Sequence, residues 1–174
     1  MHGEKSGMAK LPKITESPPD DGRMRLLDSV ARDAAKYLKV SFDTDSSDTI
    51  VTAVNDCIRK IQKGHGPKFP EDERVDLVLG CLWGSQLVKE LNWEWVNVVF
   101  HDHGDSTAVG VVSPKRDLAI YPFEFVYGCI ENHATVTILL AYNMLKDSSR
   151  NVPTLPPHSF TNVMDHVHHI VPPD

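Results

Sequence analysis

The spacing of apolar residues changes at Trp93, and this change constrains the fold more than any other feature. Upstream, in VDLVLGCLWGSQLVKEL at 75–91, apolar residues recur with the three- to four-residue period of a helix. Downstream, in WEWVNVVFH at 93–101, successive side chains alternate between two faces, as in a strand. STAVGVVS and DLAIYP predict two more strands, with PKRD as the turn between them. Helices followed by a three-stranded antiparallel meander predict an α+β domain.

Two helices are predicted ahead of this central one. The first spans 23–39, and its buried stripe comprises Leu26, Leu27, Val30, Ala31, Ala34, Tyr37 and Leu38. Ser47 or Asp48 can cap the second, and Gly64 in KGHGP is predicted to end it. Pro70 is predicted to open the central helix. Gly80 and Gly84 lie one turn apart in it, which predicts close approach of another element.

Helices are also predicted after the sheet. Pro122 can start one in which Phe123, Val126, Tyr127 and Ile130 share a face. Residues 134–146 are ambiguous, because their first half is β-branched and their second half favours a helix; we predict a helix.

The two ends of the 174-residue chain differ in composition from its middle. Residues 1–21 are polar and rich in Pro, Gly and Lys, which predicts a flexible arm. Residues 147–174 are interrupted by prolines, which predicts a loosely docked tail. The interpretation is therefore one domain at 22–146 between an arm and a tail.

The motif HDHGD at 101–105 is the first candidate site. If the strand continued through it, His101 and His103 would project from one face, and Asp105 could complete a metal site. The same residues also favour a turn, since Gly104 tolerates a positive φ and aspartate side chains accept hydrogen bonds from nearby backbone amides. We interpret the motif as a hairpin turn, with a metal site or a binding loop around Asp102 as the alternatives.

Trp93 and Trp95 flank Glu94 and lie on the same side of the first predicted strand. Packing between sheet and helix is one interpretation. The alternative is an exposed aromatic anchor at a protein interface, where tryptophan is enriched.

Cys57, Cys81 and Cys129 are far apart and each lies among apolar residues, which predicts reduced core thiols. A thiol enzyme pairing Cys81 with His133 is an alternative, although burial in an apolar helix would suppress the nucleophile. HVHH at 166–169 resembles a metal-binding tract, for which adventitious affinity is the simpler explanation.

Composition and motifs exclude several functional classes. The net charge of −6 argues against a general nucleic-acid binder. The N-terminal stretch lacks the apolar core of a signal peptide, and VTILLAYNML is too short to span a bilayer. We therefore expect a cytoplasmic protein with no membrane association. No P-loop, dinucleotide fingerprint, nucleophile elbow or zinc-protease motif is present in the sequence.

LGCLWGSQLVKELNWEWVNV, the strand pair after it and DLAIYPFEFVYGCIE together resemble a bacterial domain family of unknown function. In that family a glycine-containing helix leads into a Leu-x-Trp-x-Trp-like strand, a short sheet and a helix started by Tyr/Phe-Pro. The resemblance covers residues 70 to about 145 and rests on Leu79, Gly80, Gly84, Leu91, Trp93 and Pro122. It implies no catalytic residues, and it does not explain the N-terminal helices or the tail.

These observations predict a non-enzymatic binding protein without a cofactor, of the immunity or adaptor type, that masks a functional surface of a partner. The immunity comparison is an analogy at the level of small acidic α+β folds. The negative charge favours a basic protein partner, such as a toxin or an effector. The predicted contact residues are Trp93, Glu94, Trp95, His101, Asp102, His103 and Asp105. The alternatives are a metal-dependent hydrolase built on His101, His103 and Asp105, a thiol enzyme, and a secretion chaperone.

Overall fold

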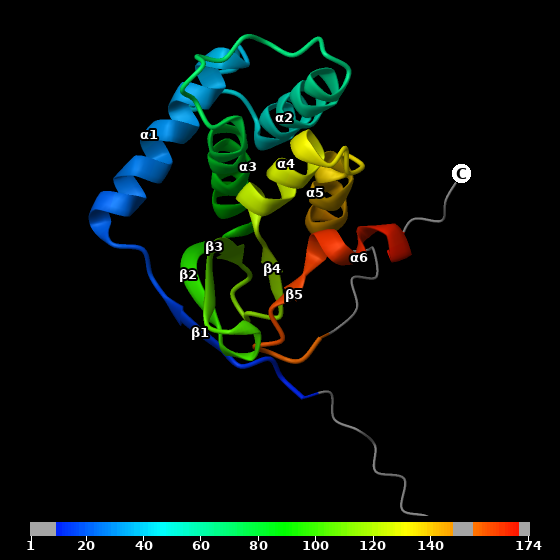
Figure 1. Ribbon diagram of the computed structural model, residues 1–174. Coiled ribbons are helices and arrows are strands. Elements are labelled where there is room, and N and C mark those ends of the chain that lie inside the picture. The colour runs from blue at the N-terminus through cyan, green and yellow to red at the C-terminus, as the bar shows by residue number, and fades with distance from the viewer. Residues whose placement is uncertain (1–9, 148–154, 171–174) are drawn as a thin grey trace, which may run out of the picture.

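The computed structural model describes residues 10–147 and 155–170 (Figure 1). Its helices are α1 (Asp21–Tyr37), α2 (Ser47–Gln62), α3 (Val75–Leu91), α4 (Pro122–Glu131), α5 (Ile138–Lys146) and α6 (Val163–Ile170), with a 3-10 turn η1 (His101–His103). Its strands are β1 (Ile14–Ser17), β2 (Glu94–Phe100), β3 (Ser106–Val112), β4 (Leu118–Ile120) and β5 (Thr161–Asn162). Figure 1 shows the larger helices gathered at one end of the sheet, with α1 along one side. The predicted α+β class is confirmed.

The strands form one five-stranded sheet in the order β1-β2-β3-β4-β5. The predicted meander is present as β2, β3 and β4, and each neighbouring pair in it is antiparallel. β5 joins parallel to β4, so the sheet is mixed and has two more strands than predicted.

Part of the N-terminal segment, for which a flexible arm was predicted, forms the edge strand β1. Ile14–Ser17 pairs with β2 in the register Ile14↔Phe100 to Ser17↔Asn97. Four residues are too few for an alternation of apolar and polar side chains to predict a strand. The pairing that stabilises them is with β2, which is distant in sequence. Residues 1–9 lie outside the described part of the chain.

The C-terminal tail also belongs to the fold over its described residues. The turn between β3 and β4 accepts hydrogen bonds from it, Phe160 N to Arg116 O at 2.8 Å and Thr161 N to Asp117 O at 2.9 Å. Val163, Met164 and Val167 of α6 are buried in the main core. The domain therefore extends beyond both predicted boundaries, because non-local contacts hold segments that lack a strong local pattern.

Side-chain caps explain where the first two helices begin. The Asp20 carboxylate accepts a hydrogen bond from Arg23 N at 2.7 Å, and the Ser46 hydroxyl accepts one from Thr49 N at 3.1 Å. The cap of α2 is thus Ser46, one residue before Ser47 and two before Asp48, the two predicted caps. Helix α3 begins at Val75, not at Pro70, and a left-handed Asn92 with φ of 60° ends it. The ambiguous stretch at 134–146, predicted as a helix, is helical only over Ile138–Lys146; its β-branched first part, 134–137, is not.

Helix α3 is the centre of the main core. Its two glycines receive aromatic rings: a Cβ atom at Gly80 would come within 2.6 Å of Phe123 Cδ1, and one at Gly84 would overlap the Trp95 indole. The Trp95 and Phe123 rings stack on each other with centroids 5.9 Å apart. The predicted close approach at both glycines is confirmed, and it joins the helix to β2 and α4.

The opposite face of the sheet carries a second, smaller core. Its buried members are Val96, Val98, Val112, Ala119, Tyr121 and Phe160. Phe160 comes from the C-terminal segment, so this segment covers part of the face that the helices leave open.

Candidate functional site

The motif HDHGD forms the tip of the β2–β3 hairpin, as the turn interpretation predicted. His101–His103 is a single 3-10 turn, followed by positive φ at Gly104 (66°) and Asp105 (56°). Nδ1 of His101 donates to the Asp105 carboxylate at 2.7 Å, because a carboxylate only accepts. Nε2 of the same ring lies 2.6 Å from the Thr15 hydroxyl. The tip is therefore held by its own side chains and by β1.

Backbone contacts reinforce this attachment. Lys13 N donates to the Asp102 carboxylate at 3.0 Å, and His101 N donates to Lys13 O at 2.9 Å. Because the strand ends before His101, His101 and His103 do not share a strand face. Both ring nitrogens of His101 already have protein partners, and no group of three or more His, Cys, Asp or Glu among the described residues could hold a metal ion.

Trp93 and Trp95 are core residues. Each is 6% exposed, and both belong to the main core with α3. An aromatic anchor must face solvent before its partner arrives, so the packing interpretation is the one that fits this geometry.

Glu94 is exposed, but it belongs to an ion-pair cluster within the sheet. Arg116, at the turn between β3 and β4, donates to Glu94 at 3.1 Å and to Glu16 of β1 at 3.0 Å. The Arg116 side chain is largely buried, and its hydrogen bonds to the two carboxylates raise its pKa further above the ordinary value. Glu94 therefore helps to tie the edge strand β1 to the turn.

The three cysteines are free and buried, as predicted. Burial raises the pKa of the Cys81 thiol to about 12, and the positive charge of Arg23 offsets this only in part. A thiol that stays protonated at neutral pH is a poor nucleophile, so the geometry does not support a thiol enzyme at Cys81. The HVHH tract forms the end of α6, and its side chains at 168–169 lie outside the described ones.

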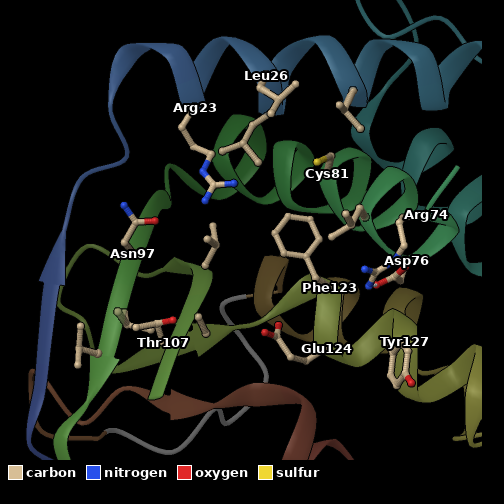
Figure 2. A pocket seen from close by; sticks show the side chains of 17 residues that line it. Arg23, Leu26, Arg74, Asp76, Cys81, Asn97, Thr107, Phe123, Glu124 and Tyr127 are labelled. Atoms are coloured by element: carbon tan, nitrogen blue, oxygen red, sulfur yellow. Dashed lines mark hydrogen bonds and ion pairs between the residues drawn. The ribbon is translucent and has the colours of Figure 1, made fainter. Parts of the chain in front are cut away.

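A different site appears between the helices and the sheet: an open groove of about 740 Å³ (Figure 2). Its floor is the helix-facing side of β2 and β3, where Asn97, Val99, Thr107 and Val109 alternate with residues of the second core. Its walls come from three helices and carry Leu26, Leu27 and Val30 of α1, Leu77 and Cys81 of α3, and Phe123, Glu124 and Tyr127 of α4. We call this feature the helix–sheet groove.

Large apolar side chains remain exposed around the helix–sheet groove. Leu26 is 55% exposed, Leu77 38% and Tyr127 50%, and each comes from a different helix. Among the described residues only Leu11 and Met24 are other large apolar residues of comparable exposure. Isolated exposed apolar side chains need no explanation, but three that converge on one concave site do.

The charged groups of the groove are of two kinds. Arg74 donates two hydrogen bonds to Asp76, at 3.1 and 2.8 Å, so these two charges satisfy each other. Arg23 and Glu124 form no ion pair within the described part of the chain. Figure 2 shows both side chains at the cavity, reaching from different walls.

Sequence reasoning missed this site because its residues come from five elements. It assigned Leu26 and Tyr127 to buried helix faces. One signal was available: Leu26 and Leu27 are adjacent, and adjacent residues of a helix point about 100° apart, so one of the two lies towards the edge of the apolar stripe. The predicted contact residues lie elsewhere: Trp93, Glu94 and Trp95 at the start of β2, and His101, Asp102, His103 and Asp105 at the hairpin tip.

No helix among the described residues is long and apolar enough to cross a membrane. No family model, no curated protein and no solved structure matches this chain.

Proposed function

We propose that this protein is a non-enzymatic binding protein that holds an apolar segment of a partner protein in the helix–sheet groove. The observation that carries the proposal is the convergence of exposed Leu26, Leu77 and Tyr127 on one cavity. Exposed apolar surface costs free energy in water, and binding of a partner that covers it removes this cost.

The chemistry of the groove supports binding over catalysis. Cys81 is the cysteine that lines the groove, and burial raises the pKa of its thiol to about 12. Asp76 is engaged with Arg74, and no histidine lines the groove. Thr107, Glu124 and Tyr127 also line the groove, and no hydrogen bond or ion pair in the described part of the chain joins them into a catalytic arrangement.

The groove accommodates several of the roles that the sequence suggested. An immunity protein, an adaptor and a secretion chaperone would each use such a surface, and the partner's identity distinguishes them. The net charge of −6 favours a partner with a basic surface, since opposite charge speeds association. The resemblance at residues 70–145 stays a prediction.

A phage-displayed library of random 16-residue peptides, selected on the wild-type protein, tests the proposal. Selected peptides should be rich in leucine, isoleucine and phenylalanine, and Leu26→Glu should weaken their binding about tenfold or more. Fluorescence anisotropy of labelled peptides measures this, and thermal melts establish that the variant folds.

Leu11→Glu is the matched control, because Leu11 is 46% exposed and does not line the groove. It should leave peptide binding unchanged. Selected peptides that bind the Leu26→Glu and wild-type proteins equally well would show that the groove is not the binding surface.

A further inference from the structure

The groove also restricts the conformation of what it can bind, and this inference rests on the proposed binding function. Every residue of the β2 floor from Glu94 to Phe100 is paired with β3, and β1 pairs with β2 on the other side. The walls are helices, whose backbone groups bond within themselves. On β3, β4 pairs only with Val111 and Val112, so among the described residues the edge of β3 from Ser106 to Gly110 is unpaired on the side away from β2. Those groups point along the plane of the sheet, so the face and the helical walls themselves offer few backbone partners to a ligand.

An extended segment in such a groove would leave its own amides and carbonyls without partners, at a cost for every group removed from water. Strand addition works at a sheet edge, not on a sheet face. A helix satisfies its backbone internally and presents apolar side chains on one stripe. The regular secondary structure around the cavity therefore favours a helical occupant.

Charge adds a second restriction. The Arg23 guanidinium on α1 and the Glu124 carboxylate on α4 both reach the cavity, and neither has an ion-pair partner in the described residues (Figure 2). A helix seated between them would place the two flanks of its apolar stripe against opposite charges. This is the arrangement by which flanking charges select partners in coiled coils.

We propose that the occupant of the helix–sheet groove is an amphipathic helix of a partner protein, with an acidic side chain on one flank of its apolar stripe for Arg23 and a basic one on the other flank for Glu124.

Three synthetic helical peptides test this proposal. They share one leucine stripe and differ in its flanks: acidic on one and basic on the other, acidic on both, or basic on both. Exchanging the two flanks of the mixed peptide is not informative, because a helix that turns end for end restores the same pairing. The wild type should bind the mixed peptide best, by about threefold per ion pair, and high salt should remove the preference.

Single charge reversals should move the preference predictably. Arg23→Glu should bind the doubly basic peptide best, and Glu124→Lys the doubly acidic one. Arg25→Glu on α1 and Glu131→Lys on α4 change the net charge equally, do not line the groove and should keep the wild-type order. Circular dichroism should show the peptides gaining helix on binding.

The outcomes separate the two proposals. Equal affinity for all three peptides, each weakened by Leu26→Glu, would overturn the charge pairing and leave the binding function intact. Library-selected peptides that bind in the groove without becoming helical would overturn the helical occupant. Insensitivity of every peptide to Leu26→Glu would overturn both.

Discussion

Trp95 occupies the space that a side chain at position 84 of α3 would need. Contact between a helical glycine and an indole leaves no room for even one methyl group without movement of the ring. Since the Trp95 ring also stacks on Phe123, a shift of the indole would be passed on to a wall of the groove.

Replacing Gly84 by leucine should lower the free energy of unfolding by about 1–3 kcal/mol, because it overpacks a filled site. Urea denaturation measures the change. Gly128→Ala in α4 is the control: nothing lies within 4 Å of a Cβ there, so the better helix former should raise stability by about 0.5–1 kcal/mol. An unchanged midpoint for Gly84→Leu would show that the helix does not pack against Trp95 as described.

Arg116 should matter more to stability than either of the carboxylates it contacts. Arg116→Ala leaves both Glu16 and Glu94 without their partner and should cost about 0.5–2 kcal/mol, since water can reach both carboxylates. Arg116→Lys should recover only part of this, since one ammonium lacks the planar fork that reaches two carboxylates. Thermal or urea melts measure both variants.

The neighbouring Lys115→Ala is the control and should change stability by no more than about 0.5 kcal/mol. An Arg116→Ala protein as stable as this control would mean that the cluster does not hold β1.

At the scale of single residues, the sequence predicted the packing of side chains in the core better than the partners of charged side chains. The close approach at Gly80 and Gly84 follows from the rarity of two glycines one turn apart inside a helix, and the structure confirms it. The partner of Glu94 could not be predicted, because Arg116 comes from a turn and reaches Glu94 only once the sheet has formed.

At the scale of elements, local signals predicted the helices, and non-local pairing decided the rest. Helices α1 and α2 have apolar stripes and side-chain caps within their own sequence. β1 and β5 have neither, and each exists through pairing with a strand far along the chain. Pro70 misled the prediction of α3, since proline is also common in turns and Glu73 N closes one on Pro70 O.

Helices α2 and α5 are joined by an ion pair that makes stability depend on acid pH. Lys146 donates to the Asp48 carboxylate at 2.6 Å, and this hydrogen bond lowers the pKa of Asp48 from its ordinary 3.8. A lowered folded-state pKa stabilises the fold fully above the unfolded-state pKa, and the contribution is lost as the pH falls through the folded-state pKa. The pair is about half exposed, so salt should weaken it.

Asp48→Asn should therefore be less stable than the wild type at pH 6, and the difference should shrink as the pH falls below about 4. Urea midpoints across this range measure it. Lys146→Met should lose the same contribution, and the double variant should lose little more. A difference independent of pH would show that the pair is not the cause.

At the scale of the whole molecule, the helix–sheet groove could not be predicted, since it exists only where α1, α3, α4, β2 and β3 meet. The adjacency of Leu26 and Leu27 indicates that one of them lies at the edge of the buried stripe, but not which one; in the structure Leu26 is 55% exposed and Leu27 is 6% exposed. The predicted hairpin tip was found because its turn chemistry lies in five consecutive residues.

The thiols provide a readout of the whole fold. Burial raises the pKa values of Cys57 and Cys129 to about 11 and that of Cys81 to about 12. At pH 8 the native protein should react slowly with Ellman's reagent at all three positions, and quickly after unfolding in guanidinium chloride. Because Cys81 lines the groove, a bound peptide should slow its labelling further. Rapid labelling of the native protein at pH 8 would contradict the described burial.

The pairing of β1 with β2 has a consequence for the order of events during synthesis. Ile14 leaves the ribosome several seconds before its partner Phe100, at a translation rate of about 5–20 residues per second. Until then β1 has no strand to pair with, and the groove lacks its floor and the α4 wall. The helix–sheet groove therefore comes into existence only after most of the chain has been made.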